Sequence, residues 1–450
     1  MSTTRMDRRT FLKVLAAGGA AFSAAPLYRA LAGQETSDEF FIIIHASGAW
    51  DVTVGLDPKN EPKGIIQPSG TQTVDITRVP LWQSDNAPLP AGGYSLELVR
   101  PPGNSPLAFG PGIGDLLRHY DRLTVVNGIN MSTVSHTDGV AYVLTGRHLA
   151  GSRTVQSSID TVLADSLGTK QLFPAVSISF ASSFVGNLDR RAVPLRIGDL
   201  SAVTPVLSRS TLYDTVDQRD VVTAALADEA RELSQISYYP DAYNGFAFQY
   251  EGLRQANRTN LLNLFTPSYL LAQYPKFPTD GSSAYGALSV ELFKRNLART
   301  ISFARGGYDT HSGYAQNQIP AQQNLFGMIS TLIDYLDATP HPTLMADKLS
   351  DHTHIMVVSD FCRTPMFNLT GGRDHYPTGS ALVISPKFKR NFAFGASDDE
   401  QLLPLPTGNF SDGQRAITPP DLLATFLAAV NVDPRRYLRD GEVVKELLGA

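Results

Sequence analysis

The sequence predicts an α/β protein built on a doubly wound, mostly parallel sheet. Short apolar runs of strand length recur along the chain, and amphipathic stretches with helical periodicity lie between them. This alternation is typical of a sheet that is covered by helices on both faces. The expected strands are Phe40–His45, Leu123–Val126, Ala175–Phe180, His354–Val358 and Ser380–Ile384.

The first strand and the covering helices have the clearest patterns. Phe40–His45 is an almost uninterrupted apolar run, which predicts a buried strand, and the loop after it ends in the carboxylate of Asp51. We expect His45, inside this run, to be a core residue with its hydrogen bonds satisfied. Ile319–Leu336 and Asp421–Val430 have the apolar spacing of helices that pack against a sheet.

Two regions depart from the alternation. The segment 57–106 is dense in Pro, Gly, Asn and Ser, which predicts a long irregular excursion with a hairpin. Residues from about 205 to 300 have a helical pattern, which is clearest in Asp214–Ser237 and Tyr250–Leu264. We expect this helical insertion to cap the sheet like a lid.

The segment 1–32 has the features of a twin-arginine signal peptide in the right order. Arg8-Arg9 and Phe11-Leu12-Lys13 precede a short apolar stretch, and Ala30-Leu31-Ala32 provides the small residues that a signal peptidase cuts after. The apolar stretch is too short to span a membrane. We therefore expect export through the twin-arginine (Tat) translocase and a periplasmic or secreted mature protein that begins near Gly33.

Composition narrows the class of protein further. The net charge of −5 at pH 7 argues against nucleic acid as a partner. Cys362 is the only cysteine, so no intramolecular disulfide can form, and the 42% of hydrophobic residues must supply the stability. No other long apolar run follows the signal, so we expect no stable membrane span in the mature form.

Three motifs in the last third of the chain combine carboxylates with imidazoles at turns that follow apolar runs. Open α/β sheets gather their ligand-binding groups at such strand ends. Carboxylates and imidazoles suit Zn²⁺ or Mn²⁺, and several acidic groups close together need a cation to neutralise them. The motifs are Gly306-Gly307-Tyr308-Asp309-Thr310-His311, Ser359-Asp360-Phe361-Cys362-Arg363-Thr364-Pro365 and Gly372-Arg373-Asp374-His375-Tyr376-Pro377.

In this order, the motifs resemble the DUF1501 family of exported bacterial proteins, whose biochemical function is not established. The resemblance also includes Trp50-Asp51 and the sequence Pro420-Asp421-Leu422-Leu423-Ala424-Thr425-Phe426, and it covers the mature chain, residues 33–450. The family is related to the alkaline phosphatase and sulfatase superfamily. The resemblance therefore implies a sheet whose strand ends hold two divalent cations, usually zinc, around a phosphate or sulfate ester.

The resemblance also implies a set of metal ligands. Asp309 and His311 match one metal site, and Asp360 matches a carboxylate that is shared with the second site. In the superfamily a metal-binding histidine usually follows the residue matched by Asp360, but Phe361 stands there. We therefore expect one or two ions, zinc or alternatively manganese. The expected ligands are Asp51, Asp309, His311, Asp360, Asp374 and His375.

The identity of the nucleophile stays open between three alternatives. In the superfamily it lies at a fixed distance before a sequence matched by Leu144-Thr145-Gly146-Arg147, and that distance leads to His136. Ser135 or Thr137 is the nucleophile if the loop is shifted by one residue. Alternatively, His136 is a metal ligand or a general base and water attacks directly. The third alternative is that no catalysis occurs.

Arg363 has two interpretations. Either it clamps an anionic oxygen of the substrate, in which case Arg363 or alternatively Arg147 helps to neutralise the developing charge, or it forms a structural ion pair with a site aspartate. The function we expect is an exported metal-dependent hydrolase that acts on a small anionic ester of phosphate or sulfate. The alternative, favoured by Phe361 and His136, is a non-catalytic exported binding or assembly protein on a degenerate phosphatase-like scaffold.

Overall fold

The computed structural model describes residues 38–59, 71–73, 98–169, 171–200, 216–237, 243, 261–366, 368 and 370–449. The expected signal peptide 1–32 and its cleavage site lie outside these residues. Among the described helices, none combines the length and the apolar character needed to cross a membrane.

The centre of the molecule is an eight-stranded sheet with the order β12-β4-β11-β8-β1-β7-β5-β6. Neighbouring strands pair in parallel, except that β11 runs antiparallel to both β4 and β8. The predicted α/β fold with a mostly parallel sheet is therefore confirmed. The strands are β1 (Phe40–Ala46), β4 (Leu123–Asn130), β5 (Phe173–Ile178), β6 (Leu195–Ile197), β7 (Ala298–Arg305), β8 (Thr353–Ser359), β11 (Thr378–Ile384) and β12 (Phe392–Phe394).

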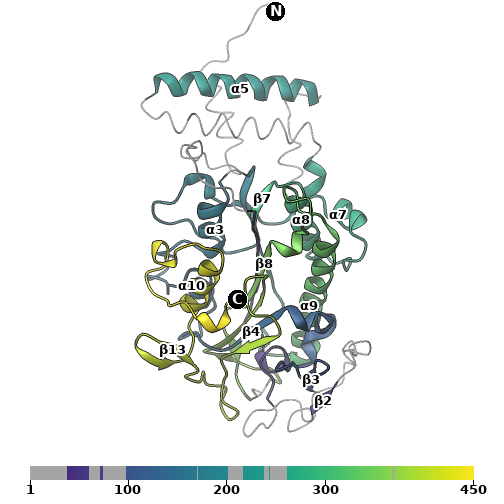
Figure 1. Cartoon of the computed structure of the whole chain (residues 1–450), viewed down its shortest axis with the longest axis vertical. Coiled ribbons are helices and arrows are strands. Elements are labelled where there is room, and N and C mark those ends of the chain that lie inside the picture. The colour runs from purple at the N-terminus through teal and green to yellow at the C-terminus, as the bar shows by residue number, and fades with distance from the viewer. Residues whose placement is uncertain are drawn as a thin grey trace, which may run out of the picture.

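Helices cover both faces of the sheet, and strand β1 shows why (Figure 1). All its residues are buried, with alternate side chains in two separate hydrophobic clusters. Burying one such Ile or Phe side chain stabilises the fold by about 1.5–3 kcal/mol. One face is covered by α7 (Pro267–Gln273), α8 (Ser283–Lys294) and α9 (Tyr314–Ala338), and the other by α2 (His136–Thr145), α3 (Ile159–Leu167) and α10 (Pro419–Ala429).

The two regions that depart from the alternation are described in part. Helix α5 (Val216–Ile236) confirms the helix expected at 214–237, and it lies at one end of the molecule in Figure 1. Residues 250–260 lie outside the described part, and the limits of the helical insertion stay a prediction. In segment 57–106, β2 (Thr71–Thr73) and β3 (Leu98–Arg100) pair in parallel, so these strands do not form the expected hairpin.

Short elements complete the fold. The remaining strands are β9 (Cys362–Arg363), β10 (His375–Tyr376), β13 (Gly408–Phe410) and β14 (Gly413–Arg415). The 3-10 helices are η1 (Val52–Val54), η3 (Pro111–Arg122), η4 (Arg190–Ala192), η5 (Leu261–Phe265), η6 (Leu349–Asp351), η7 (Pro434–Arg436) and η8 (Lys445–Leu447).

The strand directions bring the sequence motifs to one edge of the sheet. The parallel strands β1, β7 and β8 end at the same edge, and the antiparallel β11 begins there. Strand β4 also ends at this edge and leads into α2. The loops 47–51, 131–135, 306–313 and 360–377 therefore meet, which is the arrangement that the motifs predicted.

Candidate metal centre

Four side chains, from the first residue of α2 and from the loops 306–313 and 360–377, converge at the sheet edge. We call them the His/Asp cluster: His136, Asp309, His311 and His375. The Oδ1 atom of Asp309 is the common point. It lies 3.6 Å from Nε2 of His136, 3.2 Å from Nε2 of His311 and 3.9 Å from Nε2 of His375. The cluster thus presents three imidazole nitrogens and one carboxylate oxygen to a single small volume.

Each histidine of the cluster uses its other ring nitrogen, Nδ1, in a hydrogen bond to an oxygen. A backbone carbonyl or an ionised carboxylate can only accept, so Nδ1 must carry the proton and donate it. Nε2 of each neutral imidazole is then left with a free lone pair. The three bonds are His136 to Asp360 Oδ2 at 2.6 Å, His311 to Asp374 Oδ1 at 2.7 Å and His375 to the carbonyl of Val134 at 2.8 Å.

This assignment of protons makes one contact in the cluster unusual. The Nε2 atoms of His311 and His375 are 2.9 Å apart. With both Nδ1 atoms protonated, two lone pairs of neutral rings would face each other, which is repulsive. The contact becomes favourable only when a cation lies between the nitrogens, either a proton on one ring or a metal ion bound by both.

The cluster also passes a simple test of fit for a metal ion. Ligands about 2.0–2.1 Å from a tetrahedral zinc ion lie about 3.3 Å from one another. The separations of Asp309 from the three histidines and of His311 from His375, from 2.9 to 3.9 Å, bracket that value. In addition, Nε2 of His136 is buried and has no hydrogen-bond partner among the described residues. Ligand atoms of His136, Asp309 and His375 all lie within 4.8 Å of one another.

Asp360 lies behind His136 instead of facing the centre of the cluster. Its side chain is buried, and it accepts hydrogen bonds from Nε2 of His45 at 2.5 Å and from Nδ1 of His136 at 2.6 Å. Burial alone would raise the pKa of Asp360, but the bonds from the two histidines outweigh it and hold the pKa well below its usual value. Asp360 therefore fixes the orientation of the His136 ring, and its expected role as a metal ligand stays a prediction.

The same hydrogen bond raises the pKa of His136, because its cation is stabilised beside the Asp360 carboxylate. Partial burial of His375 and the positive charges around it lower the pKa of that histidine. The two imidazoles therefore differ in basicity although they contribute to the same cluster.

Asp51 forms a buried ion pair in place of its expected role as a ligand. Its Oδ2 atom accepts from Nη1 of Arg373 at 2.7 Å and from the hydroxyl of Tyr314 at 2.7 Å. Its Oδ1 atom accepts from the amide and the hydroxyl of Thr53. Both Asp51 and Arg373 are almost completely buried. The pair ties the loop after β1 to the residue that precedes Asp374 and His375.

Arg363 forms the ion pair with a site aspartate that was the second of its two interpretations. Its side chain is buried, and Nη2 donates to Asp309 Oδ1 at 2.8 Å. The other guanidinium nitrogens donate to the carbonyls of Ala49 at 2.8 Å and Arg373 at 3.1 Å. Partial burial would raise the pKa of Asp309, but Arg363 outweighs this effect and lowers it. Arg363 therefore keeps Asp309 anionic and has no nitrogen directed at a substrate.

The other predicted catalytic residues are peripheral. The exposed side chains of Ser135 and Thr137 contact each other, with their hydroxyl oxygens 3.2 Å apart. Within the described residues, neither hydroxyl is hydrogen-bonded to the His/Asp cluster. Arg147 pairs with Asp440 beyond the other end of helix α2. Asp374 supports His311 through its Nδ1 atom and is half-exposed.

Two supporting groups were not predictable from the sequence. His45 was expected to be a satisfied core residue, and it is buried and hydrogen-bonded, but its partner is Asp360 of the site. Its place in an apolar strand gave no signal for this contact. The carbonyl of Val134 fixes the ring of His375, and no side-chain pattern can reveal a backbone acceptor.

Part of the chain matches a known protein family. Residues 278–442 match the DUF1501 family, described as a protein of unknown function. The predicted resemblance is thus confirmed for this segment. The DUF1501 segment contains Asp309, His311, Asp360, Asp374 and His375, whereas His136 lies before it. No curated protein sequence matched the chain.

Solved structures show similarity to the chain at low sequence identity. The lipoteichoic acid synthase LtaP from Listeria monocytogenes has 9% identity and a TM-score of 0.39, over 92% of this chain and 76% of that one. A protein of the alkaline phosphatase superfamily from Vibrio parahaemolyticus has 11% identity and a TM-score of 0.31, over 95% and 76% of the two chains. A protein of glycosaminoglycan metabolism from Bacteroides thetaiotaomicron has 9% identity and a TM-score of 0.31, over 88% and 73%.

Proposed function

We propose that the chain is a metal-dependent hydrolase that holds one divalent cation, zinc or manganese, in the His/Asp cluster. The observation that carries this proposal is the 2.9 Å contact between Nε2 of His311 and Nε2 of His375, whose Nδ1 protons are fixed by acceptors. A shared cation removes the repulsion at this contact. Imidazole and carboxylate are also the ligand types that zinc prefers, apart from thiolate.

We propose one ion in place of the two in the related superfamily. The resemblance also assigns Asp51 and Asp360 as metal ligands, and both carboxylates lie outside the cluster. Asp51 is occupied by Arg373 and Tyr314, and Asp360 by two histidines and the amide of Gly48. A second ion would have to displace these donors from buried carboxylates, which costs several kcal/mol for each charge left unpaired.

In such a site the metal and the residues around it have different roles. A bound divalent cation would polarise the substrate and lower the pKa of a water molecule. Asp360 holds the ring of His136 in place, and Arg363 holds Asp309 in its anionic form. The side chains of Asp309 and His311 are 55% and 46% exposed, so water and a substrate can reach the cluster. The exposed hydroxyls of Ser135 and Thr137 contact each other, and among the described residues neither is hydrogen-bonded to the cluster, which favours water as the nucleophile.

The substrate class follows from the family resemblance, and we propose a phosphate or sulfate ester. The twin-arginine signal adds the proposal that the protein acts in the periplasm or outside the cell. A non-catalytic metal-binding protein is the second candidate. It is favoured by the number of ligands, because four protein ligands can close a tetrahedral zinc site and leave no position for water.

Elemental analysis of the full chain, followed by ester hydrolysis assays, tests the proposal. We expect about one zinc or manganese ion per chain and release of phosphate or sulfate from aryl esters that depends on this ion. The Asp309→Ala variant should lose both, and Asp412→Ala, at an exposed aspartate outside the cluster, should keep both. One tightly bound ion without hydrolysis of any ester would support the non-catalytic candidate. A metal content that is the same in Asp309→Ala would contradict the site itself.

A further inference from the structure

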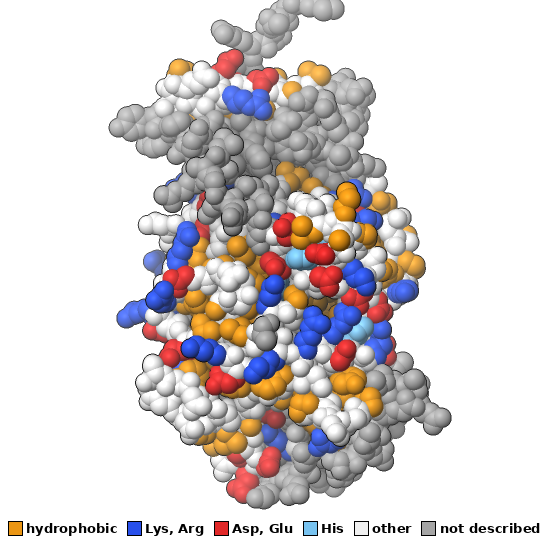
Figure 2. Space-filling view, in the orientation of Figure 1, with side chains coloured by type: hydrophobic (Ala, Val, Ile, Leu, Met, Phe, Trp, Pro, Cys, Tyr) orange, Lys and Arg blue, Asp and Glu red, His pale blue; other side chains and the backbone are white. Residues whose placement is uncertain are grey.

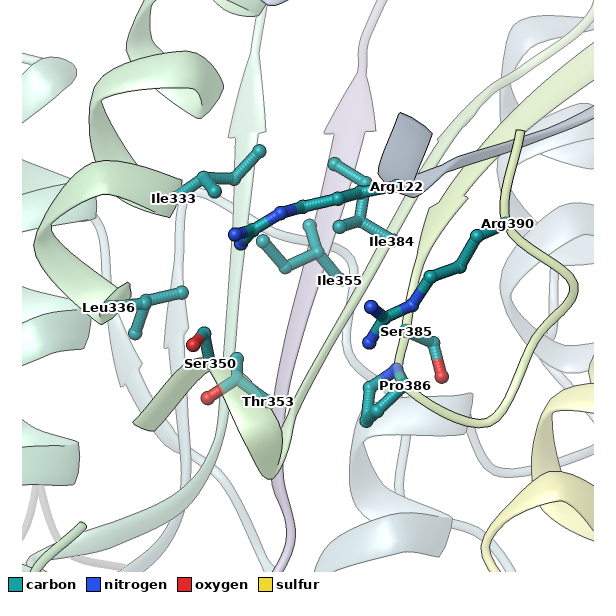
Figure 3. Close-up of a pocket in the computed structure, with 10 residues that line it drawn as sticks. All are labelled: Arg122, Ile333, Leu336, Ser350, Thr353, Ile355, Ile384, Ser385, Pro386 and Arg390. Atoms are coloured by element: carbon teal, nitrogen blue, oxygen red, sulfur yellow. The ribbon is translucent and has the colours of Figure 1, made fainter. Parts of the chain in front are cut away.

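A second group of histidines and carboxylates lies at the opposite edge of the sheet from the His/Asp cluster. It surrounds the place where β1 and β8 begin, with Glu39 just before β1 and His352 just before β8. The amide of Phe40 donates to the carbonyl of His352 at 2.7 Å and joins the two strand starts. Figure 3 shows the adjoining hollow, which Thr353, the first residue of β8, helps to line. Because β8 runs from this edge to the loop 360–377, the group is separate from the candidate metal centre.

The imidazole of His352 lies between two carboxylates. Its Nε2 atom is 2.9 Å from Oδ2 of Asp347, and its Nδ1 atom is 3.8 Å from Oε2 of Glu39. The second distance is too long for a hydrogen bond but short enough for an ion pair. Nδ1 is buried and has no hydrogen-bond partner among the described residues. The side chains of His352 and Glu39 are each 18% exposed, so water screens this contact only weakly.

Neither neutral form of His352 suits both carboxylates. An ionised carboxylate can only accept hydrogen bonds, whereas a neutral imidazole has one N–H group and one lone pair. With the proton on Nε2, the lone pair of Nδ1 faces Glu39, and with the proton on Nδ1, the lone pair of Nε2 faces Asp347. An imidazolium has an N–H group on both sides, so both contacts become attractive.

The groups around Glu39 keep its carboxylate ionised. Nε2 of His354 is 2.8 Å from Oε2 of Glu39, and Nζ of Lys387 is 3.8 Å from Oε1. Burial alone would raise the pKa of Glu39, but His354 and Lys387 outweigh it and lower this pKa. Burial lowers the pKa of His354, so this ring is neutral, with Nδ1 at 2.7 Å from the hydroxyl of Ser385. The carboxylate that faces His352 is thus an anion held by a neutral donor and a distant cation.

The remaining neighbour of His352 adds no charge. His341 packs beside it, with 4.7 Å between the two ring centroids. Nδ1 of His341 accepts from the amide of Leu344 at 3.0 Å, so its proton is on Nε2, which donates to the carbonyl of Asp38 at 2.9 Å. Basic and acidic side chains are interspersed over the face seen in Figure 2, so no broad field of one sign acts over the described part of that face. The two nearby carboxylates therefore dominate the electrostatics at His352.

We propose that His352 is a proton-dependent clasp between the residue before β1 and the loop before β8. The protonated ring links Glu39 to Asp347 and holds the start of β1 against the start of β8. When the pH rises and the ring loses a proton, the attraction to Glu39 is lost and the start of β1 frays. Histidine is the side chain that changes its charge between about pH 5 and 8. The clasp therefore contributes stability at low pH and loses it as the pH rises.

Hydrogen exchange of the full chain, followed by NMR, tests the clasp. The reporter is the amide of Phe40, which donates to the carbonyl of His352. We expect its protection factor to fall about tenfold between about pH 5.5 and about pH 8.5. His352→Gln keeps a donor for Asp347 but cannot gain a proton, and Glu39→Gln removes the charge that the ring faces. In both variants the protection should be low at both pH values.

The matched control is His148→Gln. His148 is also bonded to an aspartate, with Nδ1 at 2.8 Å from Oδ2 of Asp138, but its side chain is 41% exposed and lies far from β1 in the fold. This variant should keep the pH response of the native chain. A pH response that is lost in His148→Gln as well would show a general effect of histidine replacement and would overturn the proposal.

The ring of His352 gives a second measurement that needs no variant. In the native chain at about pH 5.5, NMR of ¹⁵N-labelled histidine should find a proton on both ring nitrogens of His352. A ring that carries one proton there would overturn the proposal, whether or not the variants fold. So would equal protection of Phe40 at the two pH values, or an unchanged pH response in His352→Gln.

Discussion

The loops after β1 and after β7 both end in an aspartate that the sequence assigned to a metal, yet the two carboxylates have different surroundings. Asp51 is completely buried and is neutralised by Arg373, Tyr314 and Thr53. Asp309 is 55% exposed, and three imidazoles lie around one of its oxygens. Both carboxylates are paired with a buried arginine, so what separates them is their own burial: Asp51 is enclosed by its partners, whereas Asp309 keeps an exposed face beside the imidazoles.

The largest expected effect is a difference in unfolding free energy between alanine variants of the two aspartates. Asp51→Ala leaves the buried guanidinium of Arg373 without its charged partner, which should cost about 3–5 kcal/mol of unfolding free energy. Asp309→Ala should cost far less, because its side chain is half-exposed and Arg363 keeps its carbonyl acceptors. Urea unfolding of the metal-free proteins measures both values. Equal losses would remove the distinction between anchor and ligand.

A double variant sharpens the same comparison. If Asp51 and Arg373 act as a pair, Asp51→Ala combined with Arg373→Met should lose less stability than the sum of the single variants, by about 1–3 kcal/mol. Arg435→Met is the matched control, because Arg435 pairs with Asp433 in full contact with solvent, and it should leave the unfolding midpoint unchanged. If the stability losses of the two single variants simply add in the double variant, Asp51 and Arg373 do not stabilise each other, and each is stabilised by its other partners.

Removing a hydrogen-bond acceptor of a histidine should lower the metal affinity, and the loss should be larger for a buried acceptor than for an exposed one. Asp360→Asn keeps the size of the side chain but removes the charge beside His136, and we expect about a 10–100-fold loss of zinc affinity. Asp374→Asn removes the half-exposed acceptor of His311 and should cost less. Competition with a chromogenic chelator measures both. A larger loss of affinity in Asp374→Asn than in Asp360→Asn would show that the half-exposed Asp374 is the more important support.

The smallest effect is in the titration of the histidines. In the metal-free protein, NMR should find the pKa of His136 above the usual value near 6.5 and that of His375 below it. The raised pKa of His136 means that its contribution to stability is fully present below about pH 6.5 and is lost as the pH rises through the folded-state value. Asp360→Asn should move the pKa of His136 downward and leave His375 nearly unchanged. A common pKa for both rings would contradict the contacts described for them.

Much of the fold was predictable because it rests on periodicity. The apolar runs at 40–45 and 354–358 lie in strands β1 and β8, and the amphipathic stretch at 319–336 lies in α9. The sheet edge that gathers the motifs was also predictable, because parallel strands end on the same side. These features depend on local sequence and on general rules of sheet topology.

The roles within the site could not be predicted in the same way. The sequence places Asp51, Asp309 and Asp360 in similar settings, but only the fold shows which one meets Arg373, which one meets three histidines and which one lies behind His136. In the chain, Arg373 is 322 positions from Asp51, and His136 is 224 positions from Asp360. Such pairings are set by packing and by the competition of buried charges, which leave no local pattern.

The reversed direction of β11 has a consequence for how the length of this chain can vary. A parallel strand after β8 would need a crossover to the far edge of the sheet. Because β11 starts where β8 ends, the connection 360–377 leaves and re-enters at one rim, with Asp360 near its beginning and His375 near its end. Asn368 and Thr370 of this connection donate hydrogen bonds to the carbonyl of His311, and Asn368 also donates to Asp374. Insertions or deletions between Pro365 and Gly371 would therefore move the supports of His311 while the register of the sheet stays fixed.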